Sequence, residues 1–93
     1  MKLTDNTILI TGGSDGIGLE LARSLVSANT VIICGRSETK LARARSSLPA
    51  LKTLTCDLTV ATQRNDLVDQ VVRAYPRLNL LINNAGGRRC VDL

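Results

Sequence analysis

Histidine, phenylalanine and tryptophan are absent from the 93-residue sequence, and Tyr75 is its only tyrosine. Without histidine, these residues can build no catalytic triad and no metal site that depends on an imidazole. Without large aromatics, any core must consist of leucine, isoleucine, valine and alanine. Hydrophobic residues make up 44% of the chain, which predicts a globular domain rather than a disordered one.

Cysteine is also scarce. The three cysteines, Cys34, Cys56 and Cys90, are an odd number and form no CxxC motif. This pattern argues against a disulfide scaffold or a zinc site and suits a reducing compartment. The apolar runs are too short to span a bilayer, and the first residues contain no apolar segment of a secretory signal. We therefore expect a cytoplasmic protein with no membrane contact.

The formal net charge of +4 raises the question of nucleic-acid binding. The basic residues, among them Arg43 and Arg45, are scattered along the chain, and no set of aromatics is available to stack on bases. We interpret these residues as solvated surface charges and expect no nucleic-acid partner.

Short aliphatic runs alternate with amphipathic stretches along the chain. The runs are typical of buried strands and cover residues 7–10, 30–34, 51–56 and 79–82. The amphipathic stretches have helical spacing and cover residues 17–28, 37–48 and 59–75. Ser37 is expected to cap the second helix, and Pro49 and Pro76 to end the second and third.

The resulting order, β-α-β-α-β-α-β, predicts an α/β fold with a Rossmann-like doubly wound parallel sheet. The first two strands do not alternate apolar with polar residues, so helices are expected on both faces of the sheet. Right-handed crossovers then give the strand order 3-2-1-4. A ligand is expected at the carboxyl ends of strands one and four, where the strand order reverses.

A glycine-rich segment joins the first strand to the first helix. Such a turn at a helix N-terminus favours phosphate binding, and its candidate residues are Gly12, Ser14, Asp15, Gly16, Ile17 and Gly18. A side chain at Gly12 or Gly16 would keep a phosphate from the backbone, and Gly18 allows the helix to pack closely on the sheet. The spacing is neither GxGxxG nor a P-loop. The alternative is a tight turn with spare glycines.

Two motifs together resemble the N-terminal hallmarks of the short-chain dehydrogenase/reductase family. They are Thr11-Gly12-x-x-x-Gly16-Ile17-Gly18 and the later turn formed by Asn83, Asn84, Ala85 and Gly86. Residues 18–22 and 31–37 also resemble the DltE-type branch of this family. The resemblance covers residues 3–87 and implies an NAD(P)-dependent oxidoreductase.

The resemblance also implies roles for individual residues. The glycine loop would hold the pyrophosphate of the dinucleotide, and the turn that starts at Asn83 would support the sheet centre and line the adenosine-ribose side. Asp57 would contact the adenine amino group, with Leu58 packed on the ring. The alternative for Asp57 is a local role, in which it satisfies backbone N–H groups of its turn.

The end of the second strand bears on the choice between NAD and NADP. An NAD site places a carboxylate about 20 residues past the glycines, where it binds the ribose 2′-hydroxyl. Here Gly35 and Arg36 occupy the strand end. The planar guanidinium of Arg36 suits a 2′-phosphate, so we predict NADP(H), with Ser37 and Lys40 as further donors. Glu38 is near enough to imitate the missing acid, which would favour NAD.

The chemistry implied by the resemblance needs a tyrosine followed four residues later by a lysine. Tyr75 is followed at this spacing by Asn79 and lies before the fourth strand. We therefore assign no catalytic residue. We expect residues 1–93 to be one partial NAD(P)-binding domain, the N-terminal portion of an oxidoreductase that is inactive alone.

A chain truncated after its fourth strand would leave that strand as an open edge. Such an edge predicts self-association through the fourth strand, or a fragment of a longer polypeptide. The alternative function is a non-enzymatic nucleotide-binding or interaction module that pairs with a partner through this edge.

Overall fold

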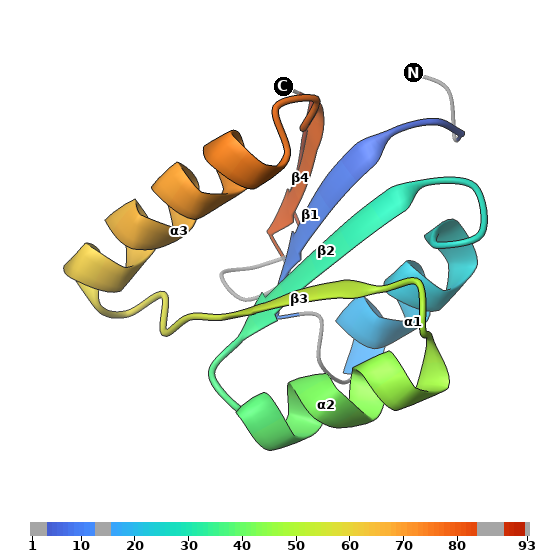
Figure 1. Ribbon diagram of the computed structural model, residues 1–93, viewed down its shortest axis with the longest axis horizontal. Coiled ribbons are helices and arrows are strands. Elements are labelled where there is room, and N and C mark those ends of the chain that lie inside the picture. Colours follow the sequence, from blue (N-terminus) through green and yellow to red (C-terminus); the bar gives the residue numbers. More distant parts are fainter. Residues whose placement is uncertain (1–3, 13–15, 84–88, 93) are drawn as a thin grey trace.

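Five strands form one sheet in the computed structural model, which describes residues 4–12, 16–83 and 89–92 (Figure 1). Four of them are parallel: β1 (Thr7–Thr11), β2 (Thr30–Gly35), β3 (Lys52–Thr55) and β4 (Leu80–Asn83). Their order is β3-β2-β1-β4. This confirms the predicted parallel sheet and the predicted strand order.

The fifth strand corrects one expectation. β5 (Arg89–Asp92) pairs antiparallel with β4, so that Leu81 lies opposite Val91 and Asn83 opposite Arg89. The expectation that the fourth strand is an open edge is therefore wrong, because the outer backbone groups of β4 bond to β5. Self-association through an open fourth strand loses its structural basis with it.

Three helices connect the parallel strands. α1 (Gly16–Leu25) and α2 (Glu38–Ser47) cover one face of the sheet, and α3 (Ala61–Ala74) covers the other (Figure 1). This three-layer arrangement is the predicted doubly wound fold.

The core is aliphatic on both faces of the sheet. Successive residues of β1 and β2 point to opposite faces, which is why these strands show no polar alternation in the sequence. Toward α1 and α2, the buried strand residues include Ile8, Ile10, Val31 and Ile33. Toward α3, they are Leu9, Ile32 and Cys34, which pack with Leu67 and Val71 of that helix.

An asparagine cluster joins the elements at the amino end of the sheet. The Asn79 side chain accepts from the backbone N–H of Thr7 at 2.9 Å and donates to Asn6 Oδ1 at 2.8 Å. Asn29 Oδ1 accepts from the backbone N–H of Asn6 at 2.9 Å. These bonds satisfy polar groups at the end opposite the predicted ligand site.

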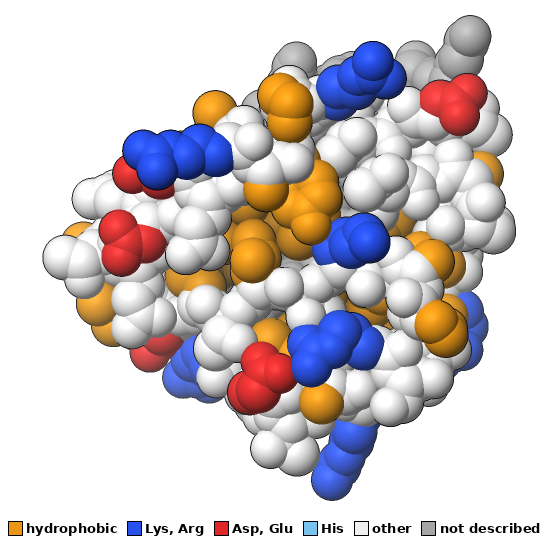
Figure 2. Space-filling model, in the orientation of Figure 1, with side chains coloured by type: hydrophobic (Ala, Val, Ile, Leu, Met, Phe, Trp, Pro, Cys, Tyr) orange, Lys and Arg blue, Asp and Glu red, His pale blue; other side chains and the backbone are white. Residues whose placement is uncertain are grey.

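No helix in the described part of the chain is both long enough and apolar enough to cross a membrane. On the face seen in Figure 2, lysine and arginine side chains are spread over several elements rather than gathered into one stripe.

Candidate functional site

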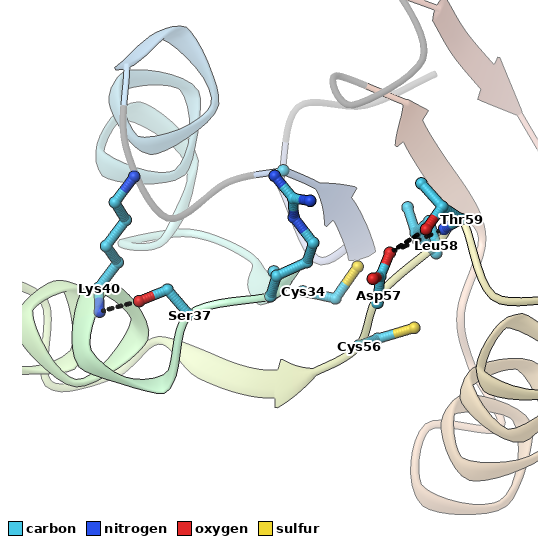
Figure 3. A pocket seen from close by; sticks show the side chains of 10 residues that line it. Cys34, Ser37, Lys40, Cys56, Asp57, Leu58 and Thr59 are labelled. Carbon is cyan, nitrogen blue, oxygen red and sulfur yellow. Dashed lines mark hydrogen bonds between the residues drawn. The ribbon is translucent and has the colours of Figure 1, made fainter.

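A pocket of about 430 Å³ opens at the carboxyl ends of β1, β2 and β3. Its volume is in the usual range for a small-molecule site. Six residues expected from the sequence line it together: Gly12, Arg36, Ser37, Lys40, Asp57 and Leu58. The remaining lining residues are Cys34, Gly35, Cys56 and Thr59 (Figure 3).

The glycine segment reaches the pocket through Gly12. Its φ of 69° is in the left-handed region, and its N–H donates to the carbonyl oxygen of Cys34 at 2.9 Å. Gly16 has a φ of 61°, but a Cβ built on it would meet nothing within 4 Å. Glycine is thus favoured at position 16 by the backbone conformation rather than by crowding within the described chain.

The later residues of this segment lie on α1. Gly18 is a buried residue of α1, in agreement with the expectation that it lets this helix pack closely on the sheet. Ile17 is 47% exposed, and it lines, with Gly16, a separate hollow along α1 rather than the pocket. Ser14 and Asp15 lie outside the described residues.

The junction between β2 and α2 forms the basic side of the pocket. Ser37 is the N-cap of α2, as predicted, and its Oγ accepts from the backbone N–H of Lys40 at 3.2 Å (Figure 3). Arg36 and Lys40 are both exposed and both line the pocket. Two cationic side chains and one hydroxyl therefore lie within a single turn of chain.

Asp57 forms the opposite side of the pocket with Leu58 and Thr59. Its Oδ1 accepts from the backbone N–H and the hydroxyl of Thr59, at 2.9 and 2.6 Å (Figure 3). These two bonds lower the pKa of Asp57, and the charge of Arg36 across the pocket lowers it further. The local turn role of Asp57 is confirmed.

Thr59 was not anticipated as a site residue. The signal in the sequence is Asp57-Leu58-Thr59, since an aspartate followed two residues later by a threonine is typical of an Asx turn.

Cys34 and Cys56 are buried at the base of the pocket. Cys34 is 0% and Cys56 3% exposed. Burial raises the pKa of the Cys34 thiol to about 11, with a further contribution from Cys56, while a backbone hydrogen bond from Gly12 opposes the rise. Burial also raises the pKa of Cys56. Both thiols are therefore protonated at neutral pH and are poor nucleophiles.

Glu38 does not line the pocket. Its Oε1 lies 2.8 Å from Nη2 of Arg45, and its Oε2 accepts from the Thr55 hydroxyl at 2.8 Å. The hydrogen bonds from Arg45 and Thr55 lower the pKa of Glu38. Arg45, interpreted from the sequence as a solvated charge, is in fact half-buried and ion-paired.

Asn83 lies at the carboxyl end of β4, beside β1 and away from the pocket lining. Its Oδ1 accepts from the Thr11 hydroxyl at 2.9 Å, so it connects the two central strands. Asn84, Ala85 and Gly86 lie outside the described residues. Tyr75 is the C-cap of α3, at the end of that helix remote from Thr59 and the pocket.

The model of the short chain dehydrogenase family matches residues 6–93. The chain belongs to the short-chain dehydrogenase family. Among curated members of this family, an uncharacterised oxidoreductase DltE of Bacillus subtilis is 53% identical over 93 residues, covering 99% of this chain and 37% of the relative. An L-fucose dehydrogenase of Bos taurus is 34% identical over 86 residues, covering 91% of this chain and 32% of the relative.

Solved short-chain dehydrogenase structures agree with the fold. A family member from Mycobacterium ulcerans superposes with a TM-score of 0.82 at 34% identity, over 96% of this chain and 35% of that one. An actinorhodin polyketide ketoreductase with NADPH gives a TM-score of 0.80 at 32% identity, over 90% and 34%. The chain thus spans about a third of the length of the relatives it matches.

Proposed function

We propose that this chain binds NADP(H), as the N-terminal cofactor-binding part of a cytoplasmic NADP-dependent oxidoreductase. The observation that carries the proposal is the basic side of the pocket, where Arg36, Ser37 and Lys40 stand together at the end of β2. The polyketide ketoreductase with NADPH, which has the same fold over this region, supports the assignment by analogy.

The charges around the pocket fit a 2′-phosphate better than a bare 2′-hydroxyl. Among the described lining residues Asp57 is the only acid, and it bonds within its own turn on the opposite side. Glu38, which could have favoured NAD, is engaged by Arg45 and Thr55 outside the pocket. A planar guanidinium flanked by a hydroxyl and an ammonium can bind a phosphate at several oxygens.

The rest of the dinucleotide then has a place along the sheet edge. In this proposal Asp57 and Leu58 of the pocket bind the adenine, and the backbone of Gly12, together with that of Gly16 at the start of α1, binds the pyrophosphate. The turn that begins at Asn83 would complete the site at the switch point between β1 and β4. When bound, the cofactor supplies the hydride, and the residues of this chain bind and orient it.

The test is a pair of binding titrations that follow cofactor fluorescence, with NADPH and NADH as ligands. Arg36→Asp is expected to weaken NADPH binding by about 10- to 100-fold, because it replaces a charge-assisted contact with a repulsive one. NADH binding is expected to stay the same or become tighter. Arg43→Asp, which makes the same charge change on an exposed site of α2, is the control. Equal losses in both variants, or none in Arg36→Asp, would refute the assignment.

We further propose that the proton-transfer residues of the reaction lie outside these 93 residues, since Asn79 occupies the position four residues after Tyr75. An antibody against residues 16–30 would report the mass of the natural protein in its source cells. A mass well above 10.0 kDa is expected, and activity should then be assayed in that longer protein. A mass near 10.0 kDa would instead favour a nucleotide-binding module without catalysis.

A further inference from the structure

The groups that would bind the 2′-phosphate depend on where α2 begins. Ser37 caps the helix and bonds to the backbone of Lys40 at 3.2 Å, so both residues are fixed to its first turn. Arg36 directly precedes the cap. Glu38, the first residue of α2, therefore lies within the same turn of chain as these three groups, whose role rests on the proposed function.

Glu38 belongs to a four-residue cluster, and we call it the Glu38 cluster: Glu38, Arg45, Thr53 and Thr55. Glu38 is the first residue of α2, and its two carboxylate oxygens bond separately to Arg45 and Thr55, each at 2.8 Å. Arg45, near the end of the same helix, also donates from Nη1 to the Thr53 hydroxyl. The cluster thus connects both ends of α2 to β3.

The same cluster reaches the adenine side of the pocket through the chain. Thr55 is the last residue of β3, and the next residues, Cys56 to Thr59, line the pocket. Cys56 is fixed in turn by the bond of its N–H to the carbonyl oxygen of Gly35, at 2.8 Å. The Glu38 cluster is therefore connected along the chain to both sides of the pocket, although none of its four residues lines the pocket.

We propose that Arg45 sets the cofactor preference indirectly, by holding the Glu38 carboxylate away from the ribose. Glu38 is two residues beyond Arg36, so a released carboxylate could turn toward the ribose, accept a hydrogen bond from a 2′-hydroxyl and repel a 2′-phosphate. The ion pair is only partly buried, with side chains 40% and 62% accessible, and adds little to stability. The main effect of this ion pair is to fix the position of the negative charge of Glu38.

The test compares the ratio of NADPH to NADH affinity in matched variants of the chain. Arg45→Met keeps the aliphatic part of the side chain, removes the guanidinium and is expected to lower the ratio by about tenfold. Adding Glu38→Gln to Arg45→Met is expected to restore the ratio to within about twofold of the original, because no carboxylate remains to be released. A purely structural role for Arg45 predicts no such rescue.

Two further variants make the result decisive. Arg23→Met removes the same charge from the exposed pair with Glu20 on α1, where the atoms are 3.6 Å apart, and should leave the ratio unchanged. Thr55→Val removes the hydroxyl that bonds to Glu38 but keeps a β-branched side chain and leaves Arg45 in place. It should therefore lower the ratio of NADPH to NADH affinity less than Arg45→Met does. Adding Glu38→Gln should restore the ratio in this variant as well. If the circular dichroism of Arg45→Met shows that this variant does not fold, Thr55→Val with and without Glu38→Gln tests the same inference.

The outcomes separate this inference from the proposed function. A native chain that binds NADH as tightly as NADPH would refute the proposed function, while the shift between variants would still test the role of Arg45. A native preference for NADPH that neither variant changes would refute the inference alone. A lowered ratio that Glu38→Gln does not restore would also refute it, because the effect would then not pass through Glu38.

Discussion

The buried thiol of Cys34 should limit the stability of the fold at alkaline pH. The side chain is 0% exposed, and burial raises its pKa from 9.0 to about 11. In the unfolded chain this thiol has its ordinary pKa of 9.0. Above that pH the unfolded state loses the proton while the folded state keeps it. The stability is therefore complete below the unfolded pKa and falls as pH rises toward the folded pKa.

The size of the effect follows from the difference between the two pKa values. A pKa raised from 9.0 to about 11 corresponds to about 2–3 kcal/mol lost across this range. A domain of this length has a total stability of roughly 5–14 kcal/mol. One thiol should thus remove a substantial part of the stability between about pH 9 and pH 11.

Urea unfolding of the native chain and of Cys34→Ala, at several pH values from 8 to 11, measures this loss. At pH 8 the variant should be less stable by about 1 kcal/mol, because the buried sulfur is missing. By pH 11 the native chain should have lost about 2–3 kcal/mol more than the variant, since only the native chain has this thiol to ionise, so the variant should then be the more stable by about 1–2 kcal/mol. A difference that stays constant with pH would refute the reasoning.

Two further substitutions test the backbone and the polar end of the sheet. Gly16→Ala should cost about 1–2 kcal/mol in urea unfolding, because a φ of 61° strains an alanine although nothing lies within 4 Å of its Cβ. Asn79→Ala should cost about 2–4 kcal/mol, because it removes the 2.9 Å bond to Thr7 N–H and the 2.8 Å bond to Asn6 Oδ1. Asn65→Ala, at an exposed position of α3, is the control for Asn79→Ala and should change the stability by less than about 0.5 kcal/mol. A loss below about 1 kcal/mol for Asn79→Ala would contradict the importance of the asparagine cluster.

The sheet and its strand order could be predicted because the residues of the central strands show by their apolar character that both faces of these strands are buried. Ile8 to Ile10 and Val31 to Cys34 are apolar at every position, which only a sheet covered on both faces accommodates. The cap at Ser37 was equally visible, since it is a local contact with Lys40. Features set by neighbours in the chain were thus predictable.

The features that were missed depend on contacts between distant residues. β5 is only four residues long and forms a strand by pairing with β4. No local pattern in its sequence predicts this pairing. Asn6 and Asn79 are 73 positions apart, yet they bond at 2.8 Å. Arg45 looked like a solvated charge because its partners on β3 come into reach only when α2 packs against that strand.

The same division between local and distant contacts runs through the pocket itself. Arg36, Ser37 and Lys40 follow one another within one turn, so the chemistry of the basic side can be read directly from the sequence. The position of Glu38, however, depends on Thr55, which lies 17 residues further along the chain. An acid at the start of α2 would favour NAD if it were judged by its place in the sequence alone. Its two bonds hold it outside the pocket. Under the proposed function, we therefore expect the cofactor preference to depend on how α2 packs against β3 as well as on the residue that follows β2.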